Sequence, residues 1–340
     1  MISDKPSISA QRIPWWLWLN VLSLDAPIIA MLWQEALTRC YHVKLIPGCQ
    51  LALGLAVWLI YLVDRTLDTL SKTEIHRLSV RHAFYRRHRK LFAWLIIPAT
   101  AFLLVMVALT EIPSGMLWSG LILAYFVGLY LLHFAAKPHR AAYVLGSLFL
   151  SVIGLIALSI IPLPQSHKLI YGGVLIALAT LSFFQKRTGN FQMVPKELIC
   201  GYLFAVGCSM GVSFYTRNYC AGPFSPETIM LGLLFALNCI GISCYERKTD
   251  ACFDASAICQ TWPGIVRVYP VLLLTLAVLS SWMIRLHVPH EMLHFAFAIL
   301  LGTLLLATLH LFSKRLRPDL SHVLADAAVA LPIIIVMAVQ

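Results

Sequence analysis

The sequence predicts an all-α membrane protein, a single transmembrane domain over 1–340 built from about eleven membrane-spanning helices. Of its 340 residues, 60% are hydrophobic and only 12% are charged, whereas soluble domains carry about 25% charged residues. The apolar residues come in blocks of about twenty, the length that a helix needs to cross roughly 30 Å of hydrocarbon. Inside lipid a spanning segment must satisfy its own backbone polar groups, so these blocks predict helices rather than open sheets.

The expected spans follow one another with short connections. The apolar blocks run over 15–38, 47–70, 91–110, 115–135, 139–161, 166–184, 197–214, 228–246, 266–286, 292–312 and 320–339. The polar start runs directly into Trp15 with no small-residue cleavage site, so no cleavable signal peptide is expected. The longest polar stretch, 71–90, is too short for a core of its own. We expect it to lie over a cavity mouth as a loop or a short helix.

Basic residues indicate the orientation of the chain, because cytoplasmic connections carry an excess of Lys and Arg. The formal net charge is +11, and with a cytoplasmic N-terminus about 21 of the 26 Lys and Arg lie on the inner side. The opposite orientation would place the basic run from Arg81 to Lys90 outside. Anionic membrane lipids attract the same charge, while no basic stripe or recognition fold supports nucleic-acid binding. We expect a bacterial inner-membrane protein whose 71–90 segment is cytoplasmic.

Two acidic clusters stand out because the chain holds only 15 Asp and Glu. An ionisable residue at membrane depth predicts a functional site. Asp64 and Asp68 lie at the inner end of the second block, and Glu246, Asp250 and Asp254 at the inner end of the eighth. Residues four apart stack on one helix face, where like charges repel. Mg²⁺ offsets this repulsion, suits carboxylate oxygens, and completes its shell with water and substrate phosphates.

Both clusters are expected on the cytoplasmic side, although they stand about 180 residues apart. Their two helices can therefore face each other across one cavity. Acidic walls with a metal between them suit a diphosphate, and the apolar remainder of the cavity suits an isoprenoid tail. The alternative is that the acids are solvated residues at the membrane interface, paired with Arg65, Arg247 or Lys248.

These motifs resemble those of the UbiA superfamily of intramembrane prenyltransferases. The run Asp64-Arg65-Thr66-Leu67-Asp68 resembles the DRxxD core of the first family motif, and Glu246, Asp250 and Asp254 resemble the second. Lys186-Arg187 and the stretch from Pro195 through Lys196 to Gly201 are similar to the basic loop and helix that precede the second motif. The chain departs from the pattern where Leu59 and Ile60 replace Asn-Asp, where Glu246 replaces Asp, and in about two additional spans between the motifs.

The resemblance implies a ring of helices around a central cavity that opens laterally to lipid. It implies that Mg²⁺ bridges Asp64, Asp68, Glu246, Asp250 and Asp254 to a polyprenyl diphosphate, whose prenyl group moves to an aromatic or other lipophilic acceptor. Cations must stabilise the leaving diphosphate, and aromatic rings can stabilise a carbocation. The expected substrate-binding residues are Arg65, Lys186, Arg187, Lys196, Arg247 and Tyr61, with Arg77 and Arg81 as further cations in 71–90.

Other motifs keep other functions open. His290-Glu291-Met292-Leu293-His294 matches the HExxH motif of zinc proteases, but a third ligand is needed, and His287 and Asp319 are poorly placed to provide it. His76, His82 and His88 are six apart, unlike the iron-binding boxes of membrane desaturases. Neither acidic cluster has the Gly and Ala-Arg that CDP-alcohol phosphotransferases place between their acids.

A non-catalytic or transporter-like membrane protein is the main alternative to a prenyltransferase. Spans that are unwound or broken at Gly or Pro would favour a transporter. The two blocks that carry the acidic clusters show no such break, so the sequence favours the enzyme.

Overall fold

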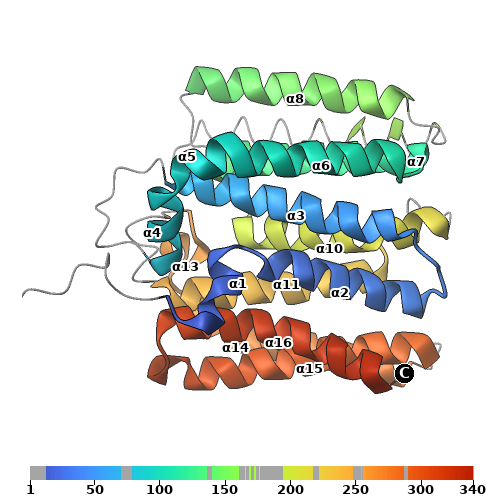
Figure 1. Ribbon diagram of the computed structural model, residues 1–340. Helices are drawn as coiled ribbons and strands as arrows, with labels where there is room; N and C mark the ends of the chain where they lie inside the picture. Colours follow the sequence, from blue (N-terminus) through green and yellow to red (C-terminus); the bar gives the residue numbers. More distant parts are fainter. Residues whose placement is uncertain are drawn as a thin grey trace, which may run out of the picture.

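The computed structural model describes residues 13–69, 79–135, 140–160, 194–216, 222–247, 254, 256–286 and 290–339, with isolated positions between 161 and 193. Every regular element in these ranges is a helix, which confirms the predicted all-α class. The long helices lie side by side in one bundle (Figure 1). The short helices α1 (Trp18–Val21), α4 (Val80–Arg87) and α13 (Ile258–Thr261) gather at one end of it.

The long helices form the body of the bundle. They are α2 (Asp25–Cys40), α3 (Pro47–Asp68), α6 (Ile97–Thr110), α7 (Ser114–Tyr130), α8 (Arg140–Ile160), α10 (Lys196–Tyr215), α11 (Pro226–Tyr245), α14 (Ile265–Arg285), α15 (His290–Phe312) and α16 (Pro318–Val339). Short elements join or extend them: η2 (Trp15–Leu17), α5 (Arg89–Leu91), η4 (Phe92–Ile96), η5 (Leu131–Ala135) and η6 (Ser313–Arg315). Proline opens α3 and α11, where its fixed φ suits the first helical position.

Among the described residues, eight helices are long and apolar enough to cross a membrane, so the chain is membrane-embedded. They match the predicted blocks that begin at 47, 91, 115, 197, 228, 266, 292 and 320. The predicted block 139–161 coincides with α8, and block 166–184 lies outside the described residues apart from isolated positions. The described spans therefore account for part of the eleven expected.

The first predicted span, 15–38, is broken in the structure. The segments Trp15–Val21 and Asp25–Cys40 meet at an angle of 78°, and the two together count as one further span at most. Ser23 lies at the break with a φ of 54°, a left-handed conformation that cannot continue a right-handed helix. The sequence carries a signal for this break, because Ser23, Asp25 and Pro27 are residues typical of a helix start, but the prediction treated the block as one span.

One large apolar core joins α2, α10, α11, α14, α15 and α16. Its centre is the fully buried Trp33, whose ring makes edge-to-face contacts with Phe235 and Phe295 at centroid distances of 6.1 and 5.5 Å. This geometry is the favourable one for aromatic pairs. The outer surface is apolar as well: Phe102 on α6 and Leu274 on α14 are exposed, as expected of side chains that face lipid.

Helices α10 and α11 pack closely against each other. A Cβ atom built on Gly201 would collide with the backbone of Ala236 and lie 2.8 Å from the carbonyl oxygen of Gly232. Small residues permit such close backbone approach in membrane bundles. This contact aligns the start of α10 with the end of α11, which places Lys196 and Glu246 at the same end of the bundle.

We expect Gly201→Ala to destabilise the protein by about 1–3 kcal/mol, the usual cost of overpacking a tight interior. The matched control is Gly120→Ala on α7, where an added Cβ meets no atom within 4 Å. Thermal unfolding in detergent should show a lower Tm for Gly201→Ala and an unchanged or slightly higher Tm for Gly120→Ala, because alanine has the better helix propensity. Equal Tm values for the two variants would contradict the close packing of α10 on α11.

Candidate functional site

A cavity of about 230 Å³ lies where α1, α2, α3, α4, α10, α11 and α16 converge. Seven carboxylates line it: Asp25, Asp64, Asp68, Glu197, Glu246, Asp254 and Asp326. Among the described residues, the permanent cations in the lining are Arg65, Arg81 and Lys196, and the titratable imidazoles are His82 and His322. With neutral imidazoles the lining carries a formal charge of −4, because three cations face seven carboxylates. Such an excess inside a membrane protein favours the binding of cations.

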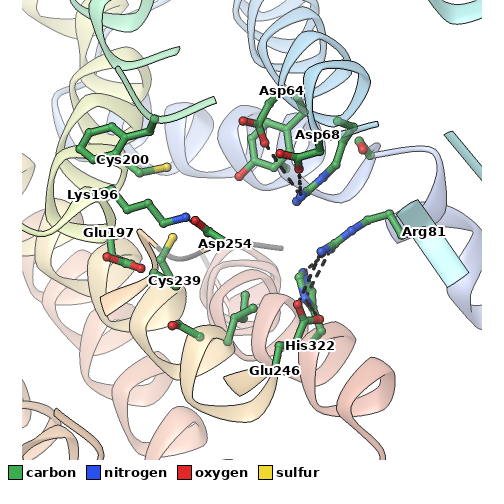
Figure 2. A pocket seen from close by; sticks show the side chains of 18 of the residues that line it. Asp64, Asp68, Arg81, Lys196, Glu197, Cys200, Cys239, Glu246, Asp254 and His322 are labelled. Carbon is green, nitrogen blue, oxygen red and sulfur yellow. Dashed lines mark hydrogen bonds and ion pairs between the residues drawn. The ribbon is translucent and has the colours of Figure 1, made fainter. Parts of the chain in front are cut away.

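The first wall is the end of α3, from which Asp64 and Asp68 project toward the cavity (Figure 2). Both carboxylates share one guanidinium: Arg65 Nη1 lies 3.9 Å from Asp64 Oδ2 and 3.6 Å from Asp68 Oδ2. The same guanidinium lies 6.0 Å from the centre of the Tyr61 ring, at the limit of a cation–π contact. The predicted i,i+4 face therefore exists, and one cation serves two acids.

His82 on α4 closes this wall, with its Nε2 atom 3.4 Å from Asp68 Oδ2. Burial lowers the pKa of His82 below its usual value, and nearby Arg81 and Arg65 act in the same direction against the bond to Asp68. The ring is therefore neutral at pH 7. Because a carboxylate can only accept, Nε2 carries the proton, and Nδ1 accepts from the Ser79 hydroxyl at 2.7 Å.

The second wall combines the start of α10 with the segment before α13. Lys196 forms an ion pair with Asp254, and Figure 2 shows the two meeting across from Asp64. Asp254 Oδ1 also accepts from the backbone N–H of Ser256 at 3.2 Å. The buried Glu197 accepts from the N–H of Ile258 at 2.9 Å, at the first residue of α13. These bonds tie the segment that carries Asp254 to α10.

The third wall joins α4, α11 and α16 through a buried network. Glu246 Oε1 lies 2.9 Å from His322 Nδ1, and Glu246 Oε2 lies 3.6 Å from Arg81 Nη2. Arg81 Nη1 also contacts His322 Nε2 at 3.2 Å. Glu246 directly follows α11, and although burial alone would raise its pKa, His322 and Arg81 outweigh this and hold the pKa well below its usual value. Glu246 is thus a fixed anion with two partners.

The fourth wall was not anticipated from the sequence. Asp25 Oδ2 accepts from Asn20 Nδ2 at 2.8 Å, and Asp326 Oδ1 accepts from Asn238 Nδ2 at 2.9 Å. His322 Nε2 lies 3.5 Å from Asp326 Oδ2, one helical turn away on α16. A signal was present, because Asp25 and Asp326 are ionisable residues inside apolar blocks. The i,i+4 spacing that predicted the site selects pairs of carboxylates, and Asp25 and Asp326 have no such partner in the sequence.

The structure distributes the predicted site residues as follows. Asp64, Asp68, Glu246, Asp254, Arg65, Lys196 and Tyr61 all line the cavity. Arg247 is exposed and is absent from the lining, because the chain turns away at the end of α11. Asp250, Lys186, Arg187 and Arg77 lie outside the described residues. Arg81, one of the two further cations expected in 71–90, lines the cavity from α4.

The fit of this lining to Mg²⁺ depends on its first wall. Asp64 and Asp68 offer hard oxygens, and their side chains are 30% and 36% exposed. Glu246 fits less well, since both its oxygens already contact buried cationic or imidazole groups. Among the described residues, no three His, Cys, Asp or Glu side chains are grouped to hold a metal ion. Mg²⁺ commonly binds through one or two carboxylates, with water and phosphate completing the shell, so Asp64 and Asp68 are the residues that would hold it.

Of the two other motifs, the HExxH motif stays a prediction, and His76 of the histidine group lies outside the described residues. The side chains of His290 and Glu291 lie outside the described residues. His82 bonds to Asp68 and Ser79, whereas His88 bonds to the carbonyl oxygen of Phe84. These two histidines therefore have separate partners, as the six-residue spacing suggested.

The partners of Glu246 predict a pH dependence of stability. Its pKa is lower in the folded protein than its ordinary value of 4.5, so the ionised form stabilises the fold above about pH 4.5, and this contribution is lost as the pH falls further. Thermal unfolding between pH 3 and 7 should show a fall in Tm on the acid side. The fall should be smaller in Glu246→Gln and unchanged in Glu111→Gln, at the exposed end of α6. An acid limb identical in all three proteins would exclude a stabilising role for the Glu246 anion.

Comparison with known protein families, with curated proteins and with solved structures found no match.

Proposed function

We propose that this chain is a Mg²⁺-dependent intramembrane prenyltransferase that moves a prenyl group from a polyprenyl diphosphate to an aromatic or other lipophilic acceptor. The observation that supports this proposal is the convergence of two acidic clusters, about 180 residues apart, on one cavity of a membrane-embedded bundle. The motifs that form those clusters are the ones that resemble the UbiA superfamily. A polar, anionic pocket at the end of apolar helices suits a substrate with a charged head and an apolar tail.

The charge of the lining explains why a divalent cation is part of the proposal. Seven carboxylates would repel a bare diphosphate. When bound, Mg²⁺ neutralises carboxylate and diphosphate oxygens together and stabilises the charge that develops on the leaving group. Arg65 and Lys196 now pair with Asp64, Asp68 and Asp254. Once those acids bind metal, the two cations can bind phosphate oxygens, which is the role that a leaving diphosphate requires.

The apolar part of the lining suits the other end of the substrate. A volume of about 230 Å³ is small beside the roughly 300–1,000 Å³ of typical ligand pockets. The cavity therefore accommodates the polar head, and the tail would extend past Ile60, Leu131 and Phe134 toward lipid. The rings of Tyr61 and Tyr130 line the same space and can stabilise an allylic carbocation. Helix α4 covers one side of the cavity, where it would limit the access of water.

We place the site on the cytoplasmic side of a bacterial inner membrane, and the distribution of basic residues supports the cytoplasmic side. Helix α4, which contributes Arg81 and His82 to the lining, also carries Arg86 and Arg87. The connection η6 carries Lys314 and Arg315 and leads directly into α16, whose first turns contribute His322. Basic residues therefore flank the cavity end of the bundle, and an excess of them marks the cytoplasmic side.

A second candidate function is cation-coupled transport. The broken first span favours it, because transporters bind ions at discontinuous helices, and Asp25 stands at the break while lining the cavity. A transporter would need the cation to leave on the other side of the membrane. A prenyltransferase needs it only to hold a diphosphate. The enzyme therefore consumes a polyprenyl diphosphate, whereas the transporter moves a cation across the membrane and consumes no diphosphate.

The test uses the purified full-length protein with radiolabelled polyprenyl diphosphates, Mg²⁺ and a panel of lipophilic phenols. We expect release of diphosphate and a prenylated product. Asp64→Asn and Asp254→Asn should each lower the rate at least about 100-fold, the usual effect of removing a group that stabilises developing charge. Replacing Mg²⁺ by EDTA should abolish turnover.

The matched control is Asp319→Asn, which removes a carboxylate from α16 outside the cavity lining and should leave the rate unchanged. A wild-type protein that releases no diphosphate from any chain length would reject the prenyltransferase. If the same protein then carried Mg²⁺ or protons into proteoliposomes, followed with an entrapped fluorescent indicator, the transporter would replace it.

A further inference from the structure

We propose that the fourth wall of the cavity is a second cation site, distinct from Asp64 and Asp68. The carboxylates of Asp25 and Asp326 and the amide oxygen of Asn238 would hold one hard divalent cation, Mg²⁺ or Mn²⁺. All three residues line the cavity, and they come from α2, α11 and α16. This site goes beyond the proposed reaction, because it would bind metal without any diphosphate.

One of the three helices that carry these residues packs directly against the other two. Helix α16 contacts both α2 and α11, so the site is built on rigid elements of the large core rather than on loops. Asp25 is the first residue of α2, and its Oδ1 atom accepts from the N–H of Ala26 at 2.9 Å. Its Oδ2 atom accepts from Asn20. One lone pair on each oxygen remains available, since a carboxylate offers about four acceptor positions.

The charge of these two acids is only partly balanced by the protein, through His322 and Arg81. Among the described residues, no Lys or Arg forms an ion pair with Asp25 or Asp326; the nearest guanidinium, Arg81, pairs with Glu246. His322 contacts Asp326 at 3.5 Å and also serves Glu246. The two carboxylates repel each other electrostatically. Both side chains are half-buried, and charges of one sign held away from bulk water favour a counter-charge. A divalent cation would supply it for both acids at once.

Asn238 gives an independent indication of a ligand. Its side chain is 8% exposed, and its Nδ2 atom donates to Asp326, which fixes the orientation of the amide because a carboxylate can only accept. The amide oxygen Oδ1 is therefore a separate acceptor, and no described residue donates to it. A buried acceptor is normally satisfied. A cation between Asn238 and the two carboxylates would satisfy it.

The ligand set determines which cation fits. Three oxygens from carboxylate and amide groups suit a hard cation, and no sulfur ligand is involved. Mg²⁺ usually keeps several waters and takes few protein ligands, which agrees with a site inside a hydrated cavity. The contact of His322 with Asp326 would orient that carboxylate from behind, as supporting hydrogen bonds do in metal sites.

The experiment titrates the purified full-length protein in detergent with Mn²⁺ alone, in the absence of any diphosphate, and follows free Mn²⁺ by electron paramagnetic resonance. We expect Asp25→Asn and Asp326→Asn each to weaken the binding of one Mn²⁺ ion by at least about tenfold, the size seen when the surroundings of a metal are disturbed. Asp319→Asn, on α16 outside the lining, should bind Mn²⁺ as the wild type does.

The outcome is separable from that of the proposed function. Asp64→Asn should retain this Mn²⁺ ion while losing prenyl transfer, so failure of one proposal leaves the other standing. Unchanged Mn²⁺ affinity in both Asp25→Asn and Asp326→Asn would overturn the site, as would loss of the ion in Asp64→Asn. If those variants fail to fold, Asn238→Asp provides the test, because a third carboxylate should tighten Mn²⁺ binding at least about tenfold. Equal or weaker binding in Asn238→Asp would also overturn the site.

Discussion

The excess of carboxylates over cations inside a membrane-embedded bundle is the constraint on which the site depends. In the described part of the chain, seven acids and three permanent cations line one cavity, and a buried charge is costly unless a partner compensates it. Much of the local structure provides such partners: Arg65 serves two acids on α3, Lys196 holds Asp254, and Arg81 with His322 holds Glu246. What remains uncompensated is the negative charge that both proposals assign to divalent cations.

The scaffold brings these groups together through a few close contacts. The approach of α10 to α11 at Gly201 sets Lys196 beside the end of α11. Ser23, in a left-handed conformation, lies between the end of α1 and the start of α2. The chain bends there, and Asp25 lines the cavity. Helix α4 lies against α3, where the buried Tyr85 packs with Leu62 and bonds to Ser23 at 3.1 Å. That contact positions His82 at the first wall and Arg81 at the third wall of the cavity. Apolar packing thus determines where each charge lies.

The same electrostatics serve an enzyme and a transporter, and the difference lies in where the cation goes. In the prenyltransferase, cations remain at the end of the bundle and hold a diphosphate, with basic residues around the cavity mouth. In the transporter, the broken first span would let a cation cross. The two-motif convergence favours the enzyme, since a diphosphate needs both metal and cationic side chains, and Arg65, Arg81 and Lys196 supply the latter.

The sequence by itself determined the features that depend on local periodicity: an all-α membrane protein, the positions of most spans, and a helix face with Asp64 and Asp68. Hydropathy and i,i+4 spacing are properties of one segment, so one segment is enough to read them. Only the tertiary structure decided the partners. Glu246 meets His322 from 76 residues away, Asn238 meets Asp326 from 88, and Arg247 turns out of the cavity one residue after Glu246 turns in. Such pairings depend on how distant helices pack and rotate, and no local pattern records that.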